Sequence, residues 1–265
     1  MMEWKRVVPL GVLLLAGSLE ARAGELEAAR SEIRDGGGSS SSRSSDDDDD
    51  DSSGSSLFAL AYALEDASET QTSFRSYPYQ DGARGYRFET DPDDPDPPGR
   101  RVAGRLWAEG AWLSRGLWRS GAGLRIDGQL FGFDGDLSYY LEPAARDALY
   151  LGTANLDVIP LHARRALWRF GGGISTMIDG RVPGQDTREY ALGWNITSSL
   201  DLFPASPLVL SARIDAGRLH GAVMGRIRGT IGVALGRVHL YGGYAHTQVG
   251  TVGLGGPTLG LGLWL

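Results

Sequence analysis

Cysteine is absent from the 265 residues, which excludes disulfide bonds and also the lipid-bearing cysteine of a lipoprotein. Lysine is nearly absent too: Lys5 is the only one, so the remaining basic residues among the 26 are all arginine. A GC-rich genome explains this bias, so a single arginine carries little functional meaning by itself. Beyond the first 23 residues no run reaches about 18 apolar residues, which excludes a membrane-spanning helix there.

The first 23 residues have the pattern of a cleavable secretory signal. Lys5 and Arg6 form a positively charged start, residues 7–16 form an apolar core, and Ala21-Arg-Ala23 has the small-x-small pattern of a cleavage site. The apolar run is too short to cross a bilayer as a helix. We therefore predict a signal peptide over residues 1–23 and a mature chain that begins at about Gly24; a retained anchor is the alternative.

Residues 24–56 are predicted to form a disordered acidic linker. From Gly36 to Ser56 the chain contains only Gly, Ser, Asp and one Arg, so it has no apolar side chain whose burial could offset the entropy of ordering. Asp46 to Asp51 form an unbroken acidic run. Calcium loops alternate ligands with spacers, and contiguous carboxylates cannot all converge on one ion, so we interpret this run as a solvated spacer.

Residues 57–100 are predicted to be a partly ordered periplasmic segment. Residues 57–64 place leucines at helical spacing, residues 85–90 have the composition of a short strand, and residues 91–99 contain four prolines that require an extended or turn conformation. Whether this segment plugs or docks on the following domain is left open by the sequence.

Residues 101–265 consist of about ten runs of about 10 residues each, in which large apolar residues alternate with glycine, small polar residues or charges. The apolar face includes aromatic residues near the ends of the runs, as in the interfacial girdle of a membrane protein: Trp112, Trp118, Tyr150, Trp168, Tyr190 and Tyr244. The opposite face carries charges predicted to line a lumen: Arg105, Glu109, Arg119, Arg125, Asp127, Arg213, Asp215, Arg226 and Arg228.

This pattern predicts an all-β fold, an antiparallel up-and-down transmembrane β-barrel of about ten strands, with eight or twelve as alternatives. Lipid would contact the apolar face, and the polar face would fill the interior. An exported soluble barrel or sandwich has the same alternation, but its apolar face would line a core and bind an apolar ligand.

The C-terminal eight residues alternate without a break, with Leu263 and Leu265 on one face and Thr258 and Gly260 on the other. They resemble the C-terminal assembly signal of bacterial outer-membrane β-barrels, in which these four positions are polar, glycine, apolar and terminal aromatic or apolar. The family usually ends in Phe or Trp, whereas here Trp264 lies one place early. The resemblance implies localisation in the outer membrane of a Gram-negative bacterium, with outer-membrane lipid and the barrel-assembly machinery as partners.

Loop lengths are expected to alternate in such a barrel, with longer connections on the outward side. The longest predicted connections, residues 179–187 and 247–257, both follow odd-numbered runs, and we expect them to form an outward contact surface. Tight turns are expected near Gly128 and Gly236.

Catalytic chemistry is not predicted. The chain has 4 histidines, and the nearest approach to a hydrolase pattern is Tyr244-Ala-His246-Thr-Gln248, which has Gln248 where barrel lipid deacylases carry serine. No two histidines have ligand-like spacing on one face, so we predict no metal and no cofactor. Arginines alternate with acids, which argues against nucleic acid.

The sequence therefore predicts an outer-membrane barrel with a structural, adhesive or narrow-channel role. Balanced arginines and acids favour a filled interior; an anion-selective pore is the alternative. A lipid-modifying hydrolase acting through His246 is a more distant alternative. The ligand, solute or protein partner cannot be named from these residues.

Overall fold

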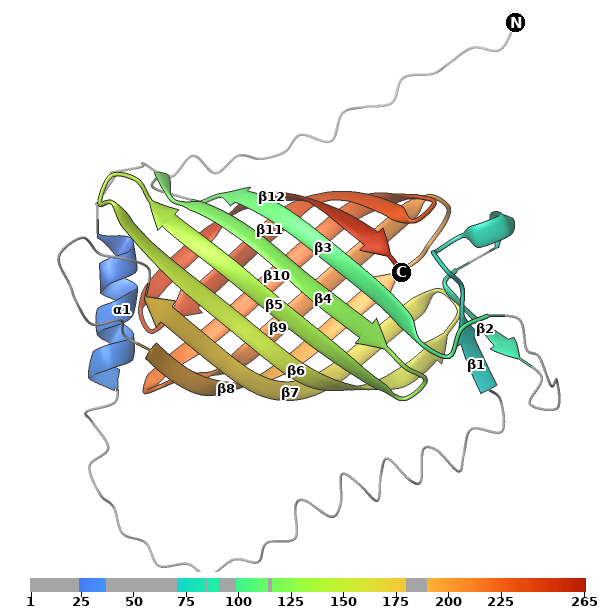
Figure 1. Ribbon diagram of the computed structural model, residues 1–265, viewed down its shortest axis with the longest axis horizontal. Coiled ribbons are helices and arrows are strands. Elements are labelled where there is room, and N and C mark those ends of the chain that lie inside the picture. The colour runs from blue at the N-terminus through green and yellow to red at the C-terminus, as the bar shows by residue number, and fades with distance from the viewer. Residues whose placement is uncertain (1–23, 37–70, 84, 91–98, 114–115, 180–189) are drawn as a thin grey trace, which may run out of the picture.

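A computed structural model describes residues 24–36, 71–83, 85–90, 99–113, 116–179 and 190–265, and the account that follows concerns these residues. None of their helices is long and apolar enough to cross a membrane. The described part comprises a closed barrel with one helix at one end and a small two-stranded sheet at the other (Figure 1).

The barrel has ten strands, and each pairs antiparallel with its neighbour in sequence. Closure is made by β12 and β3, whose register runs from Thr258 opposite Ala111 to Trp264 opposite Arg105. The prediction of an antiparallel ten-stranded barrel is thus confirmed. The strands are β3 (Ala103–Trp112), β4 (Trp118–Asp127), β5 (Phe131–Glu142), β6 (Asp147–Ala163), β7 (Ala166–Asp179), β8 (Tyr190–Leu202), β9 (Leu208–Leu219), β10 (Ala222–Leu235), β11 (Val238–Val249) and β12 (Val252–Trp264).

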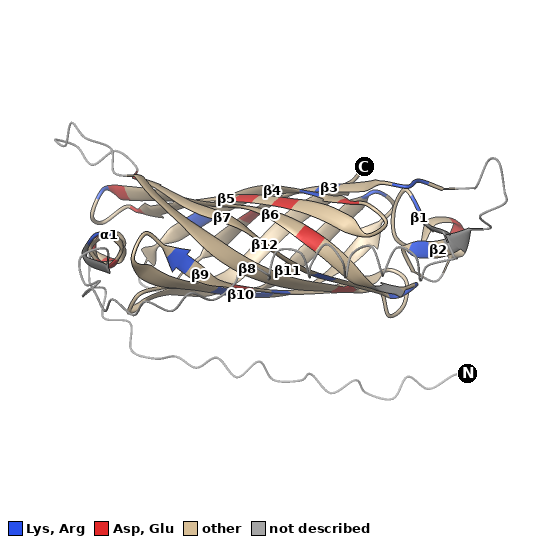
Figure 2. Cartoon of the chain, turned by 90° about the horizontal axis from the view of Figure 1, so that it is seen from below, with Lys and Arg blue, Asp and Glu red and all other residues tan. Residues whose placement is uncertain are grey.

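The two faces of each strand follow the alternation in the sequence. Successive side chains of a strand point to opposite sides of the sheet. The alternation in the sequence therefore places the apolar residues on one face and the charged residues on the other. In β12, Leu259 and Leu261 are 74% and 54% exposed, whereas Trp264 is 2% exposed. Charged residues lie along the barrel strands (Figure 2), and most of them are buried in the interior, whereas Arg218 near the end of β9 is exposed.

One predicted connection is wrong. Residues 247–257 were expected to form a long loop, but β11 and β12 stay paired up to Val249 opposite Val252, and only Gly250 and Thr251 form the turn. The alternation continues through this region, and Gly250 takes the left-handed conformation (φ +54°) that lets the chain reverse within two residues. Residues 180–189, which join β7 to β8 and include most of the other long predicted connection, lie outside the described residues.

The disordered linker is also predicted wrongly over its first part, because residues 25–36 form helix α1 (Glu25–Gly36). Leu26, Ala29 and Ile33 recur at helical spacing, and all three are buried. This apolar stripe gives the helix a face to pack, which the Gly/Ser/Asp run after it lacks. The rest of the predicted linker and the helix predicted over residues 57–64 lie outside the described residues.

At the opposite end of the barrel, β1 (Gln71–Phe74) pairs antiparallel with β2 (Arg87–Thr90), and a short 3-10 turn, η1 (Gln80–Gly82), lies between them. The strand predicted over residues 85–90 therefore corresponds mainly to β2. This small sheet docks on the barrel through aromatic side chains, so the question of docking that the sequence left open is decided (Figure 1).

Candidate functional site

The lumen is crossed by buried ion pairs, and one set of them surrounds Arg169 of β7. Its guanidinium donates to both carboxylate oxygens of Asp127, Nε to Oδ1 at 2.6 Å and Nη2 to Oδ2 at 2.7 Å. The third nitrogen, Nη1, donates to Oδ2 of Asp201 at 2.7 Å. Two parallel hydrogen bonds to one carboxylate give both strength and a defined orientation. Arg169 thereby joins β4, β7 and β8.

A second set of pairs connects strands on opposite sides of the barrel. Asp134 of β5 accepts from Arg125 of β4, at 2.9 Å from Nη2, and also from Arg213 of β9. Arg213 Nε lies 2.9 Å from Oδ1 of Asp215 on its own strand, and Arg226 of β10 pairs with Asp136 of β5. These pairs therefore span the lumen as well as lining its wall.

Glu109 of β3 is the centre of a third set. Its Oε1 accepts from Arg119 Nη2 at 2.5 Å, and its Oε2 lies 2.5 Å from Arg228 Nη2 and 3.1 Å from the Tyr241 hydroxyl, which donates to it. One carboxylate thus joins β3, β4, β10 and β11. Because its oxygens each have partners, the cost of burying its charge is largely offset.

Every charge predicted for the lumen is located there, and the structure adds the partners. Arg105 lies beside His239 (Nη2 to Nδ1, 2.8 Å) and 3.8 Å from Asp201. Their partners Arg169, Asp134, Asp136 and Asp201 belong to the same polar face of the alternation and are buried with them.

Free space within this network is small. A cavity of about 40 Å³ lies among Arg105, Arg125, Asp201, Arg213 and Arg228. A water molecule needs roughly 10–15 Å³ by this measure, so the cavity holds a few waters and no larger solute. The space among these charged residues is therefore nearly filled by their own side chains.

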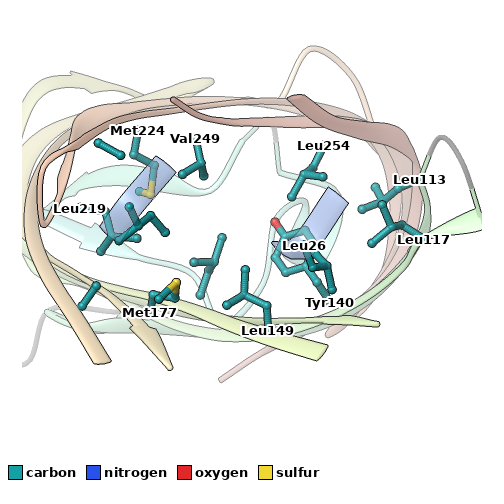
Figure 3. Close-up of a cluster of buried hydrophobic side chains, with 14 of the residues drawn as sticks. Leu26, Leu113, Leu117, Tyr140, Leu149, Met177, Leu219, Met224, Val249 and Leu254 are labelled. Carbon is teal, nitrogen blue, oxygen red and sulfur yellow. The ribbon is translucent and has the colours of Figure 1, made fainter. Parts of the chain in front are cut away.

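At one end, α1 covers the lumen through both apolar and charged contacts. Leu26 and Ile33 pack among buried barrel residues, including Tyr140, Leu149 and Met177 (Figure 3). These side chains come from β5, β6 and β7, and others come from β9 to β12, so the helix contacts much of the rim.

Arg30 of α1 supplies the charged contact. It is 3% exposed, and it lies 2.8 Å from Asp147 Oδ2 through Nη1 and 2.8 Å from Asp179 Oδ1 through Nε. Burial lowers its pKa, but the hydrogen bond and charge of Asp147, the charge of Asp179 and a hydrogen bond to Glu27 outweigh burial and hold the pKa above its ordinary value. This contact was not predicted, because Arg30 was expected in a disordered segment and Asp179 at the start of an outward loop.

At the other end, Tyr86 anchors the small sheet against the barrel. It is 1% exposed, and its ring centroid lies 4.7 Å from that of Trp264 and 5.7 Å from that of Phe203. Burial raises the pKa of its hydroxyl above the ordinary value. Gly85, just before it, has φ +115°, and a Cβ there would lie 1.9 Å from the Arg164 carbonyl oxygen. Both ends of the lumen are therefore covered.

Of the predicted assembly signal, Thr258, Gly260 and Leu263 lie in β12, and Leu265 follows its last residue. Thr258 is buried and donates through Oγ1 to the Gly110 carbonyl at 3.2 Å. Gly260 lies under the ring of Tyr241, where a Cβ would approach ring atoms to 2.3 Å. Leu263 and Leu265 point outward. Recognition by an assembly machinery stays a prediction.

Among the described residues, the hydrogen bonds of His239 and His246 go to partners other than serine. His239 is buried in the lumen, whereas His246 lies on the outer face with Nε2 3.4 Å from Gln248 Oε1. Within the described ranges no three potential ligands gather into a metal site. The expectation that the chain is not an enzyme stays a prediction.

No protein-family model matches this chain, and a search of curated proteins finds no significant relative.

Proposed function

We propose that this protein is an outer-membrane β-barrel with a sealed lumen, acting as a membrane-embedded structural or adhesive scaffold and not as an open pore. The observation that carries the proposal is the separation of its two faces: an apolar outside and a charged, paired inside. That arrangement is the reverse of a water-soluble barrel.

The apolar outside is extensive. Among the described residues, 29 large apolar side chains are exposed, and every barrel strand contributes at least one. Soluble monomers rarely expose contiguous apolar patches above a few hundred Å², so a solvent other than water best accounts for this surface. Outer-membrane lipid would contact this apolar surface favourably. The closed ring of strands leaves no unpaired backbone edge in contact with lipid.

Aromatic side chains near the strand ends also support strands that cross a bilayer. Trp112 and Trp118 stack at 5.0 Å between ring centroids, and Tyr139 and Tyr150 pack at 4.7 Å, both pairs close to the end covered by α1. Amphipathic rings favour the interface between lipid headgroups and hydrocarbon. The pairs fit a girdle at that end.

The sealed lumen favours a scaffold over a channel. Ion pairs such as Arg213 with Asp134 cross the interior, α1 covers one end and the β1–β2 sheet covers the other. A narrow anion channel, the second candidate, requires these side chains to separate. The central part of the described lumen is lined by ion pairs such as Arg169 with Asp127, a surface that does not suit an apolar ligand.

The test is fractionation of cells, with gel mobility compared before and after boiling. A closed membrane barrel resists SDS until it is heated, because each strand is held on both sides. We expect the protein in the outer-membrane fraction with a heat-dependent shift. A protein that is released without detergent would contradict the proposal.

The segment that joins α1 to the β1–β2 sheet provides a further test of this proposal, because it has to reach from one end of the barrel to the other. The helix α1 and the β1–β2 sheet lie at opposite ends of the barrel, and residues 37–70 join them and include Asp46 to Asp51. Charged side chains are costly in hydrocarbon, at about 2–4 kcal/mol each for basic residues at the midplane and less for acids. The side of the membrane on which α1 lies is therefore a decisive measurement.

A further inference from the structure

The residue before α1 makes an unusual contact with the barrel. The backbone nitrogen of Gly24 donates to Oε1 of Glu142 at 2.6 Å, and that of Leu26 donates to Oε2 at 3.2 Å. Gly24 has φ +105°, a conformation that favours glycine, and no atom lies within 4 Å of the place a Cβ would take. Glu142 is the last residue of β5.

Glu142 is a buried acid, and none of the described cationic side chains pairs with it. It is 2% exposed, and no ion pair described in the structure includes it. Its neighbours in the same rim differ, because Asp147 and Asp179 share Arg30. Two backbone N–H groups and the helix dipole stabilise a carboxylate at a helix N-terminus, but they supply no full positive charge.

The sequence offers a source for that charge. Ala21-Arg-Ala23 is a small-x-small cleavage pattern, and cleavage after Ala23 makes Gly24 the first residue. Water adds across the Ala23–Gly24 peptide bond, Ala23 leaves with a carboxylate, and Gly24 keeps its nitrogen as an amine. That amine takes up a proton near neutral pH, because the ordinary pKa of an α-amino group is about 7.7–8.0.

We infer that removal of the leader by a signal peptidase creates the α-ammonium group at Gly24 that pairs with Glu142 and holds α1 over the lumen. The inference rests on the proposed export of the chain. Before cleavage the same nitrogen belongs to an uncharged peptide group; after cleavage it carries the positive charge that Glu142 lacks. Processing of the leader thus completes the closure of this end of the barrel.

The composition of the chain makes a sharp test available. Lys5 is the only lysine and lies in the leader, so a mature chain starting at Gly24 has a single primary amine. The purified protein in detergent is treated with an amine-acetylating reagent, and the acetyl groups are counted by intact-mass measurement. We expect one acetyl group on a chain whose mass begins at Gly24; an unprocessed chain would take two, at Met1 and Lys5.

The rate of acetylation reports on the ion pair, since pairing holds the amine protonated and unreactive. We expect the folded wild-type protein to react about tenfold or more slowly than the boiled protein in SDS, as a shift of one pKa unit would give. Glu142→Gln keeps an acceptor but removes the charge, so it should bring the folded rate close to the boiled rate. Glu32→Gln is the matched control on the same helix, where Glu32 meets Thr251, and should leave the rate unchanged.

Three results would overturn the inference. A mature chain that begins at another residue removes the source of the charge. Equal rates for the folded and boiled wild-type protein exclude the ion pair without recourse to any variant. Equal acceleration by Glu142→Gln and Glu32→Gln assigns the effect to general loosening of α1. None of these results bears on the heat-dependent mobility shift, which tests the membrane barrel separately.

Discussion

Arg169 and Asp127 form a two-pronged hydrogen-bonded ion pair inside the barrel, with N–O distances of 2.6 and 2.7 Å, across strands β7 and β4. The two residues are 1% and 3% exposed. A charge so enclosed is tolerable only with its partner present, because the lumen otherwise has to solvate it with protein dipoles.

Arg169→Ala should destabilise the barrel strongly, since it leaves Asp127 without its bidentate partner and removes one donor from Asp201. Loss of one partner of a buried pair costs about 3–5 kcal/mol. The unfolding midpoint in urea, measured in detergent, should fall accordingly. Arg237→Ala, in the exposed β10–β11 turn, is the control and should have little effect; equal effects would contradict a structural role for the lumen pairs.

The purified wild-type protein should give no single-channel conductance in planar bilayers. A variant lacking residues 25–36 should behave in the same way, because the ion pairs behind α1 still fill the lumen. Stepwise conductance from the wild-type protein would favour the narrow channel. Conductance from the truncated protein alone would show that α1, and not the ion-pair network, closes the barrel.

Gly260→Ala should destabilise the barrel by about 1–3 kcal/mol, the usual cost of an added group in a packed interior. A Cβ there would lie 2.3 Å from the ring of Tyr241, whose hydroxyl donates to Glu109. Gly110 is the matched control in the adjacent strand, because a Cβ there meets nothing within 4 Å. The melting temperatures of the two variants should therefore differ; similar values would leave Gly260 without this packing role.

Ile227→Arg and Leu235→Arg should separate a membrane barrel from a soluble one. Both side chains lie on the outer face of β10 and are similarly exposed, 59% and 58%, but Ile227 is near mid-strand and Leu235 ends it. In lipid an arginine costs about 2–4 kcal/mol at the midplane and about 0–1 near the interface. Refolding titrations into lipid vesicles should show this difference, and equal small effects would argue for water on that face.

The docked position of α1 can be tested by cysteine labelling on intact cells, since the chain has no cysteine. Ala145→Cys marks the barrel end that α1 covers, and Arg237→Cys marks the opposite end. Glu27→Cys, on the exposed side of α1, should react with an impermeant maleimide in the same way as Ala145→Cys. If Glu27→Cys instead reacts in the same way as Arg237→Cys, α1 does not dock at the described end once the barrel is in the membrane.

Much of the barrel could be predicted because its signals are local. In β12 the order of Leu259, Gly260, Leu261 and Gly262 already assigns each residue to a face, whatever the strand pairs with. The same reasoning located Arg105, Glu109 and the other predicted charges in the lumen. It failed at residues 247–257, where small residues were taken for a loop although the register continues, and at Leu26, Ala29 and Ile33, whose helical spacing was assigned to the linker.

The sequence by itself determined which side chains face outward and which face the interior, because a two-residue period needs only the local backbone. Tertiary structure alone decided the partners: Arg213 of β9 meets Asp134 of β5, and Arg226 of β10 meets Asp136, only once the sheet has closed. It also decided that both ends are covered. Contacts such as Gly24 with Glu142 join segments 118 residues apart, and no local pattern encodes a distance of that kind.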